Sequence, residues 1–277
     1  MNFYIDALSA CGCNVVVGLS IAVIDLARGI GTRLRFDLLV RIGTAGWSIP
    51  ARYSERLPIG GSHLERYARQ MDAVEINTSF YRPHQRKTYE RWARSTPENF
   101  LFSVKMPKAI THEARLQNCE AVLDHFLTEA SGLGDKLGAL LVQLPPTFGF
   151  DEGTAGRFFQ DLRSQVSCPI VLEPRHPNWF TANIDKWLAD LRVSRAATDP
   201  ATVSGADIPG GWDGFAYFRW HGSPRIYYSD YDGAALKHLS TEARRSAGRS
   251  VPTWCIFDNT AAGCALGNAL DLTSSLR

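Results

Sequence analysis

Short apolar segments alternate with polar clusters and helix-like stretches along most of the chain. Each segment is rich in β-branched or aromatic residues and lacks strict polar alternation, which is typical of parallel strands buried on both faces. Their starts follow one another at intervals of roughly 22 to 38 residues, the spacing of successive βα units. The predicted strands are Leu39–Gly43, Ala73–Ile76, Leu101–Val104, Ala139–Val142, Ile170–Leu172, Ser194–Ala197, Ala216–Trp220 and Thr253–Phe257.

Helix-like stretches lie between most of these strands. The predicted helices are His63–Met71, Arg86–Ser95, Cys119–Gly132, Thr154–Val166, Ile184–Leu191, Ala234–Ala247 and Gly263–Leu276. Eight such units predict an α/β fold of the TIM-like (β/α)8 barrel type, forming one domain over residues 39–277. Breaks between Pro200 and Asp213 predict an irregular or missing helix after the sixth strand. Residues 1–38 fit none of this pattern and are interpreted as an N-terminal extension.

Composition and charge narrow the class of protein. Hydrophobic residues make up 45% of the chain and charged residues 21%, which is ordinary for a globular protein. The formal net charge of +2 provides no whole-molecule field for nucleic acid or an anionic membrane, so anion recognition would have to be local. Six cysteines without CxxC spacing indicate reduced thiols, and the apolar segment 14–24 is too short to span a bilayer. We therefore expect a cytoplasmic protein without a membrane partner, and the sequence leaves its oligomeric state open.

Polar side chains follow all eight predicted strands. In parallel barrels the strand ends converge on the active site, so these side chains are the candidate functional residues. The candidate catalytic residues are Glu75, Glu173, His176 and His221. The candidate substrate-binding residues are Trp47, Asn77, Tyr81, Lys105, His112, Gln143, Arg175, Trp179, Asp199, Arg219, Asp258 and Asn259.

The residue types in this set point to a class of ligand. Three cations at the strand ends favour a phosphate or carboxylate group, and two glutamates are enough for general acid and base chemistry. Histidines there would act as proton shuttles, and aromatic rings would either stack on a ligand or cap the core. A purely structural alternative pairs Glu75 with Lys105, and Glu173 with Arg175 or Arg219, across the mouth of a barrel.

Familiar cofactor motifs are absent from the sequence. It contains no GxxxxGK[ST], no GxGxxG after a strand, no HExxH and no GxSxG. No cofactor is therefore predicted. The strand ends carry enough His, Glu and Asp for a divalent metal centre, but the neighbouring Arg and Lys would repel a cation, and no residue is assigned as a metal ligand.

Seven strings at the strand ends resemble one known family in the same order. They are GTAGW, VEINTSFYR, FSVKMPKAITH, LLVQLPPTF, LEPRHPNW, FRWHG and FDNTAAGCALGNAL. They resemble the signatures of the DUF72 family, also called YecE-like or UPF0759, from about Leu39 to the C-terminus. The resemblance implies a fold related to the TIM barrel and a pocket at the strand ends, and it implies no reaction. Trp220 departs from the aliphatic residue that the family usually has at this position.

Three functions follow from these residues. The first is a hydrolase-like or isomerase-like enzyme that acts by carboxylate acid and base chemistry on a small anionic, phosphorylated or carboxylated, sugar-like substrate. The second is a barrel that processes or binds nucleic acid, related to endonuclease IV-type folds by analogy only. The third is a non-catalytic protein that binds a small molecule in the same pocket.

Overall fold

The computed structural model describes residues 39–276. The predicted N-terminal extension over residues 1–38 lies outside the described residues. Every predicted strand is present within one or two residues of its expected ends, apart from an extended sixth strand that divides in two around Ala196. The strands are β1 Val40–Thr44, β2 Ala73–Ile76, β3 Leu101–Lys105, β4 Leu137–Gln143, β5 Ile170–Glu173, β6 Val193–Arg195, β7 Ala197–Asp199, β8 Gly210–Gly211, β9 Ala216–Trp220 and β10 Thr253–Phe257.

The strands form two sheets. One is parallel, in the order β1-β10-β9-β7, and the other has the order β2-β3-β4-β5-β6-β8, parallel except for β8. Where β1 meets β2, a single parallel bridge joins Ala45 to Glu75. Where β6 continues into β7, the chain passes from the second sheet to the first. The fold is therefore α/β with a parallel and a mixed sheet, and a closed eight-stranded barrel is not confirmed, because the strand ladders do not join into one sheet.

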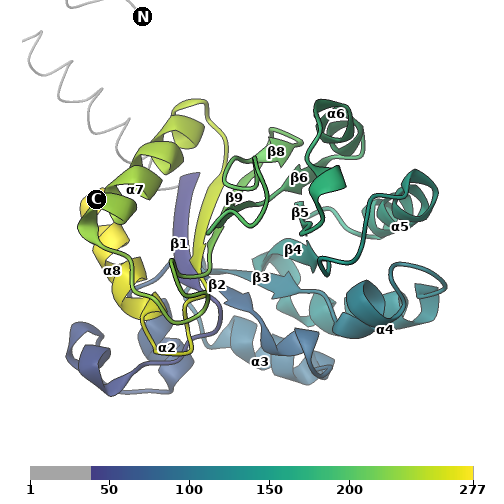
Figure 1. Ribbon diagram of the computed structural model, residues 1–277. Helices are drawn as coiled ribbons and strands as arrows, with labels where there is room; N and C mark the ends of the chain where they lie inside the picture. The colour runs from purple at the N-terminus through teal and green to yellow at the C-terminus, as the bar shows by residue number, and fades with distance from the viewer. Residues whose placement is uncertain (1–38, 277) are drawn as a thin grey trace, which may run out of the picture. The chain divides into compact units, whose positions relative to one another are not determined.

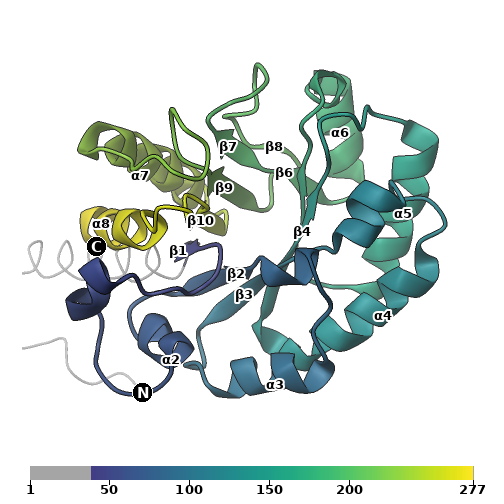
Figure 2. The same ribbon diagram turned by 60° about the horizontal axis from the view of Figure 1, so that its bottom comes forward.

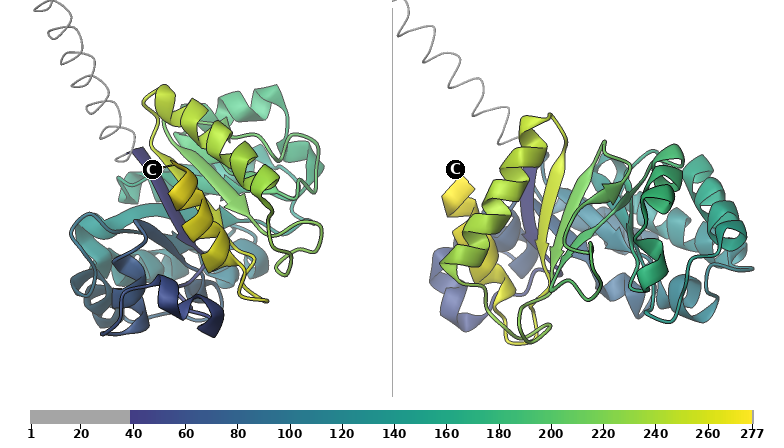
Figure 3. Two further views of the ribbon diagram at one scale, coloured as in Figure 1. Left: turned by 90° about the vertical axis from the view of Figure 1, so that its left-hand side faces the viewer. Right: turned by 45° about the horizontal axis from the view of Figure 1, so that its top comes forward.

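Helices lie outside the strands (Figures 1 and 2). Helices α7 and α8 lie side by side against β1 and β10 (Figure 3). No helix lies between β7 and β9, which confirms the predicted irregular unit. The helices of four or more residues are η1 Ala51–Arg56, α2 His63–Ala68, α3 Arg86–Arg94, η3 Ala109–Glu113, α4 Glu120–Ala130, η4 Ser131–Lys136, α5 Glu152–Gln165, α6 Ala182–Asp190, α7 Gly233–Gly248 and α8 Ala265–Leu276, and the short turns are η2 Thr78–Phe80 and η5 Pro177–Trp179.

Side chains at the helix starts explain where several helices begin. The hydroxyl of Ser62 accepts a hydrogen bond from the backbone N–H of Glu65 in a capping box. Without a capping box, Asp151, Thr181 and Asp232 each accept one backbone N–H at the starts of α5, α6 and α7. Such caps satisfy backbone N–H groups that have no partner within the helix. None of the described helices is both long and apolar enough to cross a bilayer.

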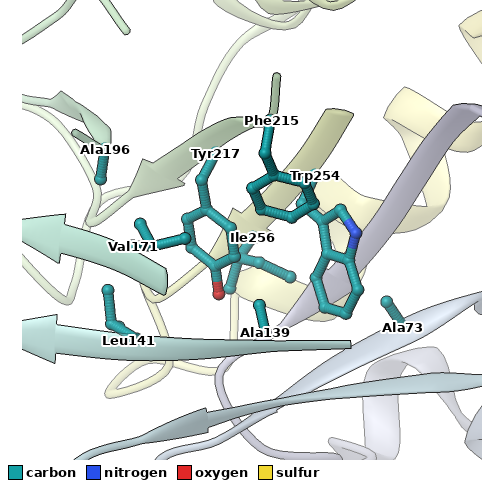
Figure 4. Packing of buried hydrophobic residues seen from close by; sticks show 9 residues of the cluster. All are labelled: Ala73, Ala139, Leu141, Val171, Ala196, Phe215, Tyr217, Trp254 and Ile256. Carbon is teal, nitrogen blue, oxygen red and sulfur yellow. The ribbon is translucent and has the colours of Figure 1, made fainter. Parts of the chain in front are cut away.

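The apolar core fills the space that the strands enclose (Figure 4). Tyr217 of β9 and Trp254 of β10 stack with ring centroids 6.0 Å apart, and Ala73, Leu141 and Val171 reach the same cluster from other strands. Because side chains alternate along a strand, the residues two positions further on face the same interior. At these positions the interior side chains change from apolar to charged, and this change locates the candidate site.

Candidate functional site

Arg219 lies at the centre of a fully buried charge network. Its Nε and Nη2 donate hydrogen bonds to the two carboxylate oxygens of Glu75 at 3.0 and 2.7 Å. Its Nη1 lies 3.1 Å from Glu173, and its Nη2 lies 2.8 Å from Asp258. One guanidinium therefore holds carboxylates from three different strand ends, as its planar set of donors allows.

The period of the strands explains this convergence. Tyr217 and Arg219 are two positions apart on β9 and share its inner face, and Glu173 follows Val171 on β5 in the same manner. The parallel register then sets how far along the strands each side chain lies. Glu75 lies opposite Ser103 of β3, and Glu173 lies opposite the last residue of β4. Side chains at corresponding depths of neighbouring strands thus meet at the C-terminal ends.

His221 and Arg175 extend the network. The two ring nitrogens of His221 lie 3.3 Å from Glu173 and 3.2 Å from Asp258. Arg175 donates from Nη2 to Glu173 at 2.8 Å. Gly222 follows the histidine with φ +98°, and a Cβ there would come within 2.9 Å of the carbonyl of Ser229, so the chain needs glycine to turn away at this point.

Lys105 differs from the two arginines, because no ion pair among residues 39–276 includes it. The side chain is 6% exposed, and its ammonium lies 4.3 Å from the centroid of the Phe80 ring. The expected pair between Glu75 and Lys105 is wrong, because Arg219 occupies that carboxylate. The expected pairing of Glu173 with Arg175 or Arg219 is found with both.

The charge network shifts the pKa values of several of its residues and of their neighbours. Burial alone would raise the pKa of Glu173, but Arg219, Arg175 and His221 hold it well below its ordinary value. The pKa of Asp258 is lowered in spite of its burial, chiefly by Arg219. Burial and the charge of Arg219 lower the pKa of Lys105 to about 8, against the opposing effect of the carboxylates. Burial, Lys105 and Arg175 also lower the pKa of His112, whose ring packs against Phe80 at 4.9 Å.

Three amides at the strand ends have a buried oxygen without a hydrogen-bond partner. These are Oδ1 of Asn77, Oε1 of Gln143 and Oδ1 of Asn259. The Nδ2 of Asn259 donates to the carbonyl of Ser229 and to Asn268, so only its oxygen remains free. Buried acceptors without a partner are costly, and their occurrence after three different strands is consistent with a polar ligand.

Five predicted residues belong neither to the charge network nor to the group of Lys105, His112 and the three amides beside it. Trp179 is fully buried, donates to the carbonyl of Phe148 and stacks on its ring, which are the surroundings of a core residue. The other four keep local contacts: Trp47 with Trp92, Tyr81 with Phe80, His176 with Asn178, and Asp199 with Tyr231. Tyr81 is 70% exposed.

The sequence interpretation missed two contributors to the site. Tyr217 donates to Glu75 at 2.9 Å and its hydroxyl oxygen lies 3.1 Å from that of Ser103, and burial together with Glu75 raises the pKa of its hydroxyl well above the ordinary value. Phe80 carries the Lys105 ammonium on its ring. The period-two pattern placed Tyr217 on the same face as Arg219 and was the available signal for it, whereas only the fold brings Phe80 to Lys105.

A cavity of about 260 Å³ lies apart from this network, at the start of α4 and along α5. Its lining includes Leu116, Asn118, Arg157 and Asp161. Within residues 39–276, no group of three or more His, Cys, Asp or Glu side chains is arranged to hold a metal ion. The clustered carboxylates are bound by arginines instead.

Comparison with known proteins agrees with this architecture. The sequence over residues 41–277 matches the family described as "Protein of unknown function DUF72". The UPF0759 protein YecE of Escherichia coli K12 is 32% identical over 174 residues, which cover 61% of this chain and 62% of that protein. The UPF0759 protein YunF of Bacillus subtilis is 26% identical over 52% of this chain and 53% of its own length. The matched part is thus less than two thirds of these relatives.

Solved structures show the same fold. A DUF72 family protein from Enterococcus faecalis superposes with a TM-score of 0.72 at 23% identity, covering 86% of this chain and 95% of that one. One from Thermotoga maritima gives a TM-score of 0.70 at 24% identity, covering 86% and 99%. These likenesses support the fold alone, and the family match extends over most of the chain. The chain therefore belongs to the DUF72 family, also named UPF0759.

Proposed function

We propose that this protein is an enzyme that acts on a small anionic substrate, a phosphorylated or carboxylated sugar-like compound, bound at the C-terminal ends of the strands. The observation that carries the proposal is Lys105, a residue that is only 6% exposed and makes no ion pair among residues 39–276, while Arg219 and Arg175 occupy the carboxylates nearby. A largely buried cation without a direct ion-pair partner is costly, and an anionic ligand would compensate for it.

Roles for the other residues follow from their contacts. Arg175, whose side chain is 19% exposed, would contact the anion together with Lys105. Arg219 and Glu75 have no exposed surface and would support the site from beneath rather than touch the substrate. Because its pKa is held low, Glu173 stays ionised at neutral pH and would orient His221 rather than donate a proton. His221, between Glu173 and Asp258, is then the proposed proton carrier.

Anion binding can be tested by thermal unfolding of the full chain with inorganic phosphate, citrate and glucose 6-phosphate, and with neutral glucose. A ligand at ten times its Kd stabilises the folded state by about 1.4 kcal/mol. For a protein of this size that corresponds to a rise in Tm of roughly 3 to 5 °C. We expect the rise with anions only, and its loss in Lys105→Met.

Lys108→Met is the matched control, since Lys108 is exposed and paired with Glu113 at 3.0 Å. An equal rise in Lys105→Met and in the wild type would place the anion elsewhere and contradict the proposal. Once a substrate is identified, His221→Asn should retain anion binding and lose turnover. Full turnover in that variant would remove His221 from the chemistry.

A further inference from the structure

Lys105 is the single buried lysine of residues 39–276, which contain all six lysines of the chain. The three carboxylates around it are directed to other donors: Glu75 to Arg219 and Tyr217, and Glu173 and Asp258 to Arg219 and His221. Among residues 39–276 the amine therefore makes no hydrogen bond or ion pair, and its only described contact is the Phe80 ring. An amine in such surroundings is available to react with a ligand.

We propose that Lys105 is a nucleophile that forms an imine with the carbonyl group of a small anionic aldehyde or ketone bound at the strand ends. The inference rests on the proposed function, since the same site must bind the anionic part of the substrate. It adds a substrate class, carbonyl compounds that carry a carboxylate or phosphate, and a covalent step. Arg175 reaches the same network through Glu173 and is partly exposed, so it can contact the anionic group.

The covalent step balances without a further reactant. The neutral amine adds to the carbonyl carbon, a C–N bond forms, and the π electron pair moves to the oxygen, which takes up a proton. The nitrogen then loses a proton, the hydroxyl group takes up a second proton, the C–O bond breaks, and water leaves as the C=N bond forms. Counted from the ammonium form, two of its protons leave in the water and the product is the protonated imine.

The electrostatic surroundings favour the neutral amine that this step needs. Burial and Arg219 lower the pKa of Lys105 to about 8, so about a tenth of the amine is neutral at pH 7. An exposed lysine with an ordinary pKa has roughly 300-fold less neutral amine at that pH. Lowering the pKa of a lysine beside another cation is a known means of activating it for imine formation.

Reductive trapping tests the inference. The full chain is incubated at pH 7 with glyoxylate, pyruvate or glycolaldehyde phosphate together with sodium cyanoborohydride, and the adduct is located by peptide mass spectrometry. We expect labelling of Lys105 at a rate at least tenfold above that of Lys108, which lies three residues away and is exposed. Labelling spread equally over Lys105 and the exposed lysines would overturn the inference.

The variant Lys105→Arg separates this inference from the proposed function. It keeps the positive charge without a nucleophilic amine, so it should still be stabilised by phosphate but should lose labelling at this position. A wild-type protein that binds phosphate and yet is not labelled at Lys105 by any of the three carbonyl probes would refute the imine and leave the proposed function standing. Equal labelling of Lys105 by neutral glycolaldehyde would support the nucleophile and contradict an anionic substrate.

Discussion

Replacing Lys105 with methionine should stabilise the folded protein at neutral pH. The substitution removes the charge of a largely buried lysine that has no ion pair in the described part of the chain, and replaces it with an apolar side chain of similar length. Most substitutions of buried residues destabilise a protein, so a gain in stability would be a specific result. It would also fit the general finding that groups used for function cost stability.

The lowered pKa sets the magnitude of this effect. In the unfolded chain Lys105 titrates at its ordinary value of 10.5, and in the folded protein at about 8. Between these values the unfolded chain binds more protons, so the stability of the wild type rises with pH across this window and is lowest below pH 8. This difference between the folded and unfolded pKa values corresponds to about 3 kcal/mol in the free energy of unfolding.

The assay is urea unfolding of the wild type and Lys105→Met at pH 7, 8, 9 and 10, with the free energies of unfolding compared at each pH. All other groups titrate in both proteins, so the difference between the two isolates Lys105. The advantage of the variant should shrink by about 2.5 kcal/mol between pH 7 and 10. A difference that stays constant with pH would show that Lys105 titrates normally, and the reasoning about its unpaired ammonium would be refuted.

Three further substitutions test the rest of the network. Arg219→Met leaves three buried carboxylates without their main counter-ion and should lower the free energy of unfolding by about 3 to 5 kcal/mol, whereas Arg56→Met, which removes an exposed ion pair, should cost less than about 1 kcal/mol. Equal effects in urea unfolding would refute the central role of Arg219. Tyr217→Phe removes one of the donors to the buried Glu75, which keeps those of Arg219, and should cost about 1 to 3 kcal/mol in the same assay; no loss would mean that this hydroxyl is dispensable. Because the pKa of Glu173 is depressed, its carboxylate stabilises the fold above the unfolded value of about 4.5, and this stability is lost as the pH falls through the folded value. Acid unfolding of Glu173→Gln should therefore show a weaker pH dependence below pH 4.5, and an unchanged profile would contradict the shift.

The strands were predictable because burial on both faces leaves a direct mark on the sequence. The segment Thr253–Phe257 was located to the residue, since a run of β-branched, aromatic and other apolar residues between Pro252 and Asp258 has few other interpretations. Whether the strands close into one barrel was not predictable in the same manner. It depends on backbone hydrogen bonds between β1 and β2, where only Ala45 and Glu75 are bridged, and such bonds leave no mark in side-chain polarity.

The candidate site was predictable in outline for a similar reason. Parallel strands end at a common edge, so polar residues after each strand had to come near one another, and Glu75, Glu173, Arg219 and Asp258 do so. Trp179 shows the limit of this rule, because it follows β5 yet turns into the core beneath the ring of Phe148. The direction of a loop side chain depends on packing partners that are distant in the sequence.

The sequence by itself determined the order of strands and helices and the set of charged residues at the strand ends, because periodicity and polarity are local properties of the chain. Only the tertiary structure decided which cation binds which carboxylate. Arg219 binds Glu75, 144 residues away, and this leaves Lys105 without an ion pair among residues 39–276. Coulombic pairing depends on separations of a few ångströms between side chains. Such separations are fixed by strand register and depth, which no local pattern in the sequence specifies.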